Sequence, residues 1–263
     1  MSLPLFQVDA FTDKLFAGNP AAVCLLDKKR DDHWMQQLAA EMNLSETAFL
    51  LKYTDGYNLR WFTPKMEVEL CGHATLASAH VLFKIGLIPA GEEVRFHTLS
   101  GLLAAKKSGD WIELNFPTQP PKTIEPPEAI LKAVDIHPSY CGKTNGKFLF
   151  EVANEEIVRN LQPDFSAIKN LTREDIIVTS VATTPGFDFV SRFFAPGIGI
   201  DEDPATGSSH CVLAPYWQGR LGKAEFKAYQ ASARGGVLRV RLAEGRTFIS
   251  GRAVTVFKTE LLD

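Results

Sequence analysis

The chain has 263 residues, of which 45% are apolar, 10% aromatic and 22% charged, a composition typical of a soluble globular protein with a sizeable core. It excludes disordered, collagen-like and coiled-coil chains. Lys and Arg total 28 against 31 Asp and Glu, so the net charge is -3; no strong basic field is available to hold a phosphate backbone, and no nucleic-acid partner is expected.

The cysteine pattern indicates a reducing environment. Four cysteines are scattered without a C-x-x-C pair, which argues against a zinc knuckle or a dithiol redox motif. We therefore expect a cytoplasmic protein. The first residues lack a basic stretch followed by an apolar run, and no uncharged window is long enough to cross a bilayer, so neither export nor membrane insertion is expected.

Short alternating or β-branched runs predict that both halves of the chain are mostly β. The expected strands of the first half are Leu5 to Ala10, Ala21 to Leu26, Thr47 to Lys52, Tyr57 to Phe62, Glu93 to Phe96, Leu102 to Lys106 and Trp111 to Phe116. Those of the second half are Lys147 to Val152, Ile176 to Ala182, Phe187 to Phe194, Glu225 to Ala231, Gly236 to Leu242 and Thr247 to Phe257.

Between the second and third of these strands, the sequence predicts a surface helix over Asp32 to Met42. Trp34, Leu38 and Met42 form one apolar stripe, and Asp31 can cap the first turn. After Phe116 comes a proline-rich stretch that suits an extended connection and not a strand or helix interior. We therefore expect two domains, residues 1–117 and 118–263.

Two further segments are predicted to be helices buried on every side. Cys71 to Phe83 and Pro204 to Trp217 contain no Asp, Glu, Lys or Arg. Gly86 and Gly219 are the expected helix-ending glycines. Each half would then be a β-rich layer that encloses one buried helix.

An internal repeat supports this organisation. Thr47 to Pro64 matches Thr179 to Pro196 at an offset of 132 residues, and with a small gap Ala74-Thr75 falls on Ala205-Thr206. The sequence therefore predicts a duplicated α+β fold of two domains related by a pseudo-two-fold axis.

The starts of the two buried helices are the expected binding region. Free backbone N–H groups and the positive end of the helix dipole collect there, so two facing helix starts in a cleft between the halves would hold an anion. Residues expected to line this site are Gly72, Ala74, Thr75, Thr206, Gly207 and Ser209.

Three titratable residues near these starts each allow a structural alternative. Asp203 could simply cap the second helix, with Pro204 at its first position. His73 could be a neutral structural histidine whose pKa the dipole lowers. Glu46 lies among apolar neighbours, where a carboxylate can exchange a proton near neutrality, or it could face water at a strand edge. No ligand spacing such as H-E-x-x-H occurs, so no metal site is expected.

Six ordered blocks along nearly the whole chain resemble the phenazine-biosynthesis isomerase (PhzF-like) family. These blocks are Phe6 to Phe11, Gly18 to Val23, Asn43 to Phe49, Arg60 to Pro64, Leu70 to Thr75 and Glu202 to Ser208. The resemblance implies the fold of diaminopimelate epimerase and proline racemase: two similar domains, each a curved β-sheet or barrel around a central helix.

The resemblance also implies roles for individual residues. Glu46 matches the family's acid/base, which moves a proton between two carbons of a small carboxylate-bearing substrate without a cofactor. His73, Asp203 and Ser208 match the supporting active-site positions, and the family suggests a homodimer. Diaminopimelate epimerase has a cysteine at each helix start; in this chain Cys71 stands near the first, whereas Pro204 falls at the second, which disfavours a two-thiol racemase.

Near the C-terminus the chain departs from the family pattern. Gln230-Ala231 and Ala233-Arg234-Gly235 replace the usual Gln-Gly and Gly-Arg-Pro, so the substrate does not transfer from the family. The sequence thus predicts a cofactor-free isomerase. The alternatives are a catalytically silent member that binds a metabolite or protein, and a one-base epimerase or lyase.

Overall fold

The computed structural model describes residues 2–89, 91–144 and 146–262, which fall into two compact units. The first unit is Met1–Asn115 with Ile249–Asp263, and the second is Phe116–Phe248. The break near residue 116 lies close to the predicted boundary. The prediction that everything after it belongs to the second domain is wrong, because the last strand of the chain pairs with the first.

The strands of the two units follow one another along the chain. They are β1 Leu3–Ala10, β2 Asn19–Leu26, β3 Glu46–Tyr53, β4 Gly56–Phe62, β5 Glu67–Val68, β6 Glu93–Thr98, β7 Gly101–Ser108, β8 Trp111–Pro117, β9 Lys122–Thr123, β10 Tyr140–Thr144, β11 Lys147–Glu151, β12 Asp175–Val181, β13 Phe189–Phe194, β14 Glu225–Gln230, β15 Gly236–Ala243, β16 Arg246–Gly251 and β17 Ala253–Leu261. Every predicted strand corresponds to one of these, except that Thr247 to Phe257 is divided between β16 and β17.

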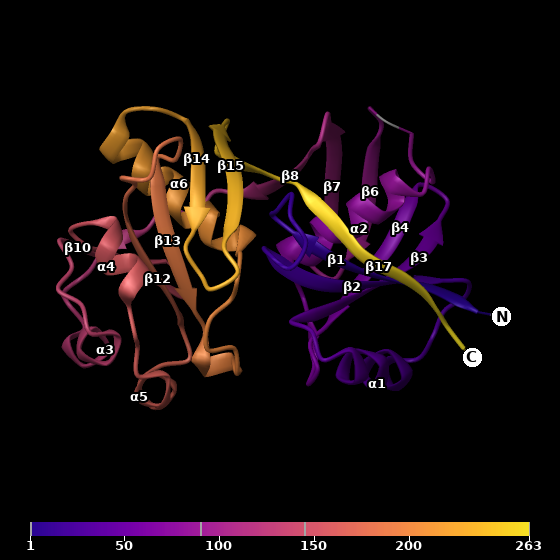
Figure 1. The fold of residues 1–263 in the computed structure, drawn as a ribbon, viewed down its shortest axis with the longest axis horizontal. Helices are drawn as coiled ribbons and strands as arrows, with labels where there is room; N and C mark the ends of the chain where they lie inside the picture. The colour runs from indigo at the N-terminus through magenta and orange to yellow at the C-terminus, as the bar shows by residue number, and fades with distance from the viewer. Residues whose placement is uncertain (1, 90, 145, 263) are drawn as a thin grey trace. The chain divides into compact units, whose positions relative to one another are not determined.

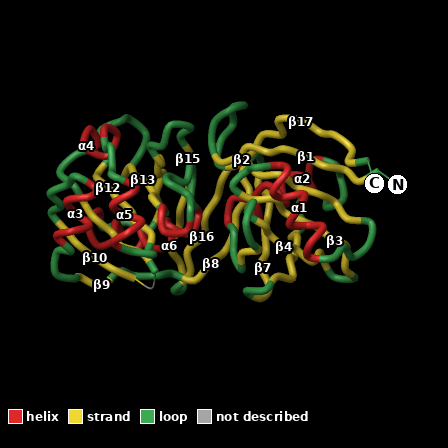
Figure 2. The backbone as a smooth tube through the Cα atoms, turned by 90° about the horizontal axis from the view of Figure 1, so that it is seen from below, coloured by secondary structure: helices red, strands yellow, loops and turns green. Residues whose placement is uncertain are grey.

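The helices fall between these strands (Figures 1 and 2). They are α1 Asp32–Met42, α2 Gly72–Lys84, α3 Glu128–Val134, α4 Glu155–Asn160, α5 Phe165–Leu171 and α6 Gly207–Leu221, with a 3-10 turn η1 at Pro196–Ile198. The predicted helix at Asp32 to Met42 is confirmed, and its cap is Asp31, whose carboxylate accepts a 2.8 Å hydrogen bond from the Trp34 N–H.

The two units repeat one strand order. In the first unit β1 and β2 are antiparallel, β2 and β3 parallel, β3 and β4 antiparallel, β4 and β6 parallel, and β6 and β7 antiparallel. In the second, β10 to β15 pair in that same alternation of directions. The predicted duplication is therefore present in the topology of the sheets.

Equivalent ion pairs occupy equivalent strands of the two units. Arg60 on β4 donates through Nε and Nη2 to both oxygens of Glu67, at 2.6 Å each. Arg192 on β13 donates in the same way to Glu202, at 2.7 and 2.8 Å. Such forked pairs fix geometry as well as charge, so the matching Arg60 and Arg192 of the sequence repeat are structural counterparts.

Both central helices are buried as predicted, but their ends differ from the prediction. Helix α2 begins one residue later, at Gly72, and α6 begins at Gly207 instead of Pro204. Ala205-Thr206 therefore precedes α6, and its match with Ala74-Thr75 inside α2 is wrong. The predicted stop at Gly219 is wrong too, because α6 continues to Leu221 and ends where Gly222 takes φ +67°.

The sheet of the second unit separates two packed layers. Ile176 and Val178 of β12 point into a core cluster with α3, α4 and α5, while Thr179 accepts a 3.1 Å hydrogen bond from Trp217 of α6. Sequence reasoning missed the three short helices that cover the outer face, because each is only six or seven residues long and shows little periodicity.

The C-terminal strand completes the first unit. β17 runs antiparallel to β1 from Leu3 opposite Leu261 to Ala10 opposite Ala253, although the two strands lie at opposite ends of the sequence (Figure 1). Hydrogen bonds between chain ends have no local sequence signature, so this pairing could not be read from composition or periodicity.

A buried carboxylate, Glu155, holds α4 to the loop after β12. It is 3% exposed, accepts hydrogen bonds from the backbone N–H groups of Thr183 (2.6 Å) and Thr184 (2.8 Å), and pairs with Arg159 at 2.6 Å. Burial alone would raise the pKa of Glu155, but these hydrogen bonds lower it to about 2.

We predict that Glu155→Ala lowers the free energy of unfolding by about 3 kcal/mol at pH 7, because buried donors and Arg159 lose their partner. The wild-type carboxylate contributes fully above the ordinary pKa of 4.5 and loses its contribution as the pH falls toward about 2, so the difference should shrink over that range. Urea unfolding at several pH values measures it. The exposed neighbour Glu156→Ala is the control, and equal losses in the two variants would contradict this role.

Candidate active site

Glu46 and His73 meet inside the first unit. Glu46 is the first residue of β3, and His73 is the second residue of α2. Glu46 Oε2 lies 3.1 Å from His73 Nε2, and the two residues are 9% and 5% exposed. The alternative that Glu46 is a strand-edge glutamate facing water is therefore wrong.

Two more side chains surround the His73 ring. Asn19, the first residue of β2, places its amide nitrogen 3.1 Å from Nδ1, and Cys71 places Sγ 3.5 Å from the same atom. A side-chain amide offers a donor on one side and an acceptor on the other, so Asn19 can pair with Nδ1 whether or not that nitrogen carries a proton. Asn19 is a site residue that sequence reasoning did not single out, although it lies in one of the family-like blocks.

Two acidic neighbours set the charge state of His73. Burial opposes its protonation, but Cys71 and Glu46 beside the ring together raise the pKa of His73 well above the ordinary value of 6.5. The expectation that the helix dipole lowers the pKa of His73 is wrong, because a full charge at 3.1 Å outweighs a partial one. Burial and the Glu46 charge raise the pKa of Cys71 to about 11, so Cys71 is a neutral thiol at physiological pH.

These residues also form the type of group that can hold a metal ion. One ligand atom each from Glu46, Cys71 and His73 lies within 4.8 Å of the other two, and all three are ligand types of zinc. Sequence spacing did not indicate this group, because Glu46 comes from a distant strand. A metal would have to displace the Cys71 proton, which the raised pKa of this thiol opposes.

In the second unit, Asp203 organises the start of α6. Its carboxylate accepts a hydrogen bond from the Thr206 hydroxyl, and its backbone oxygen accepts one of 2.7 Å from Gln230. Gln230 also accepts the Thr206 N–H at 2.8 Å. The N-cap of α6 is therefore Thr206 and not Asp203. Because Cys71 is the N-cap of α2, the residue of the second unit that corresponds to Cys71 is Thr206, and the predicted match with Pro204 is wrong.

Gln230 is the second site residue that sequence analysis missed. It lies fully buried at the end of β14 and ties the segment from Asp203 to Thr206 to the sheet. The sequence showed only that this region departs from the family pattern. A glutamine that pairs with a backbone donor and a backbone acceptor at once fixes the loop firmly, because both the carbonyl oxygen and the NH2 group of its side-chain amide are used.

The remaining predicted binding residues divide into two groups. The hydroxyls of Thr75 and Ser209 donate to backbone carbonyls at the starts of their own helices, at 2.5 and 2.8 Å, so they are not the open donors that we expected. Ser208 is half-buried at the second position of α6. The other expected binding residues, Gly72, Ala74, Thr206 and Gly207, lie at the helix starts, and their contact with a ligand stays a prediction.

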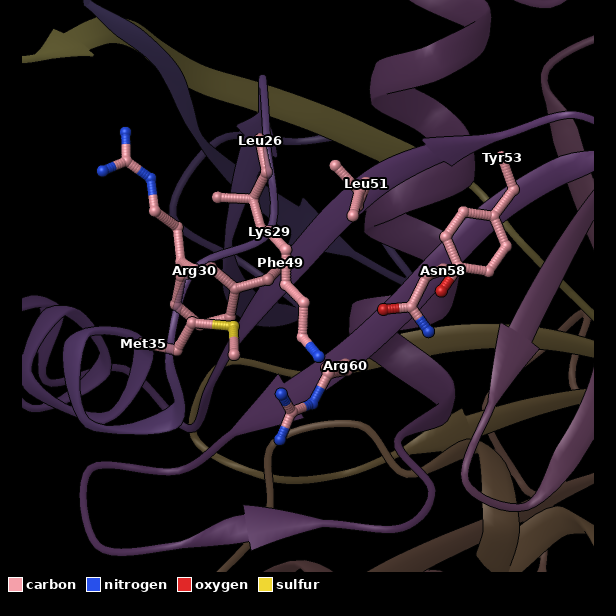
Figure 3. Close-up of a pocket in the computed structure, with 9 residues that line it drawn as sticks. All are labelled: Leu26, Lys29, Arg30, Met35, Phe49, Leu51, Tyr53, Asn58 and Arg60. Atoms are coloured by element: carbon pink, nitrogen blue, oxygen red, sulfur yellow. The ribbon is translucent and has the colours of Figure 1, made fainter.

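A pocket of about 80 Å³ lies elsewhere in the first unit, on the face of β3 and β4 that carries Phe49 and Arg60 (Figure 3). Its cationic lining residues are Lys29, Arg30 and Arg60. Arg60 is already engaged by Glu67 and Asp32, and the guanidinium of Arg30 points away from the other labelled side chains. None of the predicted site residues lines this pocket.

Proteins of one family match this chain along nearly its whole length. The family model described as phenazine biosynthesis-like protein (PhzC-PhzF) matches residues 8–259. A protein of Halalkalibacterium halodurans named an uncharacterized isomerase is 52% identical over 263 residues, covering 100% of this chain and 99% of that protein. The crystal structure of a PhzF-family protein from Enterococcus faecalis is 42% identical, with full coverage of both chains and a TM-score of 0.95.

A more distant match defines the fold. A probable proline racemase from Agrobacterium radiobacter shares 13% identity and superimposes with a TM-score of 0.67 over 99% of this chain and 93% of its own. The predicted diaminopimelate epimerase-like fold is confirmed. Within the described part of the chain, no helix combines the length and apolar character required to span a bilayer.

We predict that Cys71 resists alkylation by iodoacetamide at pH 7.5 in the folded protein, because a thiol with a pKa of about 11 holds almost no thiolate there. Peptide mass spectrometry after timed labelling measures this, and Cys24, buried with a pKa of about 12, is the matched control. Rapid labelling of Cys71 but not Cys24 would show that Cys71 is an activated nucleophile.

Proposed function

Because this chain belongs to the phenazine biosynthesis-like (PhzC-PhzF) family, we propose that it is a cofactor-independent isomerase that moves a proton within a small carboxylate-bearing metabolite. The observation that carries the proposal is the buried contact between Glu46 and His73. A carboxylate and an imidazole at 3.1 Å can pass a proton between them, and burial at the start of a helix keeps that proton from bulk water.

Glu46 is the proposed acid/base. Its carboxylate would take a proton from one carbon of the substrate and return it to another. His73, whose Nδ1 lies beside Asn19, would exchange that proton with Glu46 through Nε2. The free N–H groups at the start of α2 would stabilise the negative charge that develops on the substrate. Cys71 is proposed to fill space beside His73, since its thiol stays protonated.

Asp203 and Ser208 are the proposed orienting residues of the second unit. The hydrogen bond from Thr206 to Asp203 fixes the loop before α6, and the half-buried Ser208 stands in the first turn of that helix, whose backbone N–H groups have no partner within the helix. A substrate carboxylate would bind at this helix start through backbone and hydroxyl donors. The proposal includes a homodimer, and the four free cysteines suit a reducing, cytoplasmic setting.

We predict that Glu46→Gln, which preserves volume, lowers the rate of proton transfer by roughly 10²-fold or more. The assay follows deuterium uptake from D2O into a panel of small unsaturated and hydroxy carboxylic acids by NMR, with and without EDTA. Glu41→Gln, an exposed residue of α1, is the matched control and should leave the rate unchanged.

The same assay distinguishes the alternatives. Uptake with movement of a double bond indicates an isomerase, loss of chirality alone indicates an epimerase, and release of water indicates a lyase. Binding without uptake indicates a catalytically silent member. Unchanged turnover in a folded Glu46→Gln variant removes Glu46 from the mechanism, and loss of wild-type turnover in EDTA contradicts the metal-free form of the proposal.

We predict that Ser208→Leu weakens the binding of small carboxylates, because a bulky side chain at the second position of α6 covers the unpaired N–H groups. Calorimetry with the wild type, Ser208→Leu and the exposed Ser166→Leu control measures this, with circular dichroism to check each fold. Equal affinities in the three proteins would place carboxylate binding elsewhere.

A further inference from the structure

The loop between β1 and β2 leads directly into the proposed catalytic group. Two of the six family-like blocks, Phe6 to Phe11 and Gly18 to Val23, flank this loop, which spans residues 11–18. The loop ends where Asn19 begins β2, and the Asn19 amide nitrogen lies 3.1 Å from His73 Nδ1. A displacement of the loop end would therefore move the Asn19 side chain relative to His73.

The second half of the loop, residues 15–18, is not held by its apolar side chains. Leu15 and Phe16 are 48% and 71% exposed, so burial of apolar surface contributes little to fixing this half. Phe16 also has φ +66°, in the left-handed region that bulky residues rarely adopt. A backbone conformation of this kind persists only where surrounding contacts impose it. The second half of the loop therefore needs a polar anchor.

Asp9 of β1 supplies that anchor. Its side chain is fully buried, and its Oδ2 accepts a 2.8 Å hydrogen bond from the Phe16 N–H. A carboxylate is buried at acceptable cost only when hydrogen-bond donors meet it. In the register of β1 and β2, Asp9 lies opposite Pro20, the residue that follows Asn19. The hydrogen bond thus ties the loop back to the strand pair that carries Asn19.

Gly18 lets the end of the loop approach β1 closely. It has φ +64°, and a Cβ at this position would lie 2.2 Å from the backbone oxygen of Ala10. Only glycine, which lacks a side chain and tolerates this φ, fits there. Ala17 and Gly18 are the two residues between the held Phe16 and Asn19. The anchor at Phe16 therefore acts on Asn19 over a short and closely packed connection.

The first half of the loop is held by other groups. The Thr12 N–H donates to the backbone oxygen of Arg252 at 3.2 Å, and the Asp13 carboxylate pairs with the Arg252 guanidinium at 2.7 Å. Asp13 is exposed, whereas Asp9 is fully buried. The two carboxylates act on different halves of one loop, so Asp13 is a matched control for Asp9.

Resting on the proposed function, we infer that Asp9 is a positioning residue of the proton-transfer site: by holding the Phe16 N–H, its carboxylate fixes the loop that places Asn19 beside His73. Asp9 acts through Asn19 and neither takes nor gives a proton in the reaction. The step that it supports is the exchange between His73 and Glu46, because Asn19 contacts the opposite nitrogen of the same ring.

The first experiment needs no substrate and follows hydrogen exchange of the Phe16 N–H by NMR. In the wild type this N–H should exchange slowly with D2O, although the Phe16 side chain is exposed. Asp9→Asn should speed its exchange roughly tenfold or more, because a neutral amide oxygen accepts more weakly than a carboxylate. Asp13→Asn should leave the exchange rate unchanged.

The second experiment compares the ring ¹⁵N signals of two histidines of α2. Asn19→Ala defines the change in the His73 signals that loss of the amide contact causes. Asp9→Asn should move these signals in the same direction, by about a third or more of that change. His80, which contacts Thr255 at 3.0 Å on the same helix, is the internal reference and should not move.

The third experiment is a double-mutant cycle on the rate of deuterium uptake. Asp9→Asn alone should lower the rate by about tenfold, because a small displacement of a supporting group slows catalysis. In the Asn19→Ala background the same substitution should cost no further rate, since the group through which Asp9 acts is already gone. Asp13→Asn should leave the rate unchanged in either background.

The three experiments fail separately. Fast exchange of the Phe16 N–H in the wild type overturns the anchor, and this result needs no variant that folds. Equal movement of the His73 and His80 signals in Asp9→Asn shows a general loosening and overturns the positioning role, and additive rate losses overturn action through Asn19. If no acid shows uptake, the proposed function fails, while the exchange rates and ring signals still decide whether Asp9 positions Asn19.

Discussion

Burial of one central helix in each unit is the constraint on which the structure depends. Neither α2 nor α6 carries a charged residue through its buried stretch, so each can be enclosed without the desolvation of an ion. In the first unit α2 packs against β1, β2, β3, β7 and β17, and both units share the same alternation of antiparallel and parallel strand pairs. The start of α2 lies beside the first residues of β2 and β3, Asn19 and Glu46.

That arrangement explains why the chemistry-bearing residues gather at one end of each sheet. Glu46 begins β3 and Asp175 begins β12, the strands that pair in parallel with β2 and β11, and Glu46 contacts the start of α2. In the first unit the partner of the carboxylate is His73 at the second position of α2. In the second, Ser208 holds that position, and Asp203 arrives from the preceding loop. The duplication has thus kept the placement of the carboxyl group while changing its partners.

The N-termini of α2 and α6 also differ in the side chains that contact them. Around His73, Cys71 and Glu46 both raise the pKa of the imidazole, and Asn19 lies 3.1 Å from its Nδ1. Around Thr206, Gln230 and Asp203 use their groups to fix the backbone. The arrangement around His73 suits exchange of a proton, and the arrangement around Thr206 suits a rigid binding surface. The proposed isomerase requires both.

The sequence by itself determined the strands, the helix capped by Asp31 and the two chargeless helices, because local periodicity and composition predict them. It also determined the duplication, through the internal repeat. It also indicated Glu46, His73, Asp203 and Ser208 through family-like blocks. Only the tertiary structure decided that β17 joins the first unit, that Asn19 and Gln230 belong to the helix starts, and that Glu46 raises the pKa of His73. Those facts depend on register, burial and contact between residues far apart in the chain, and no local pattern encodes them.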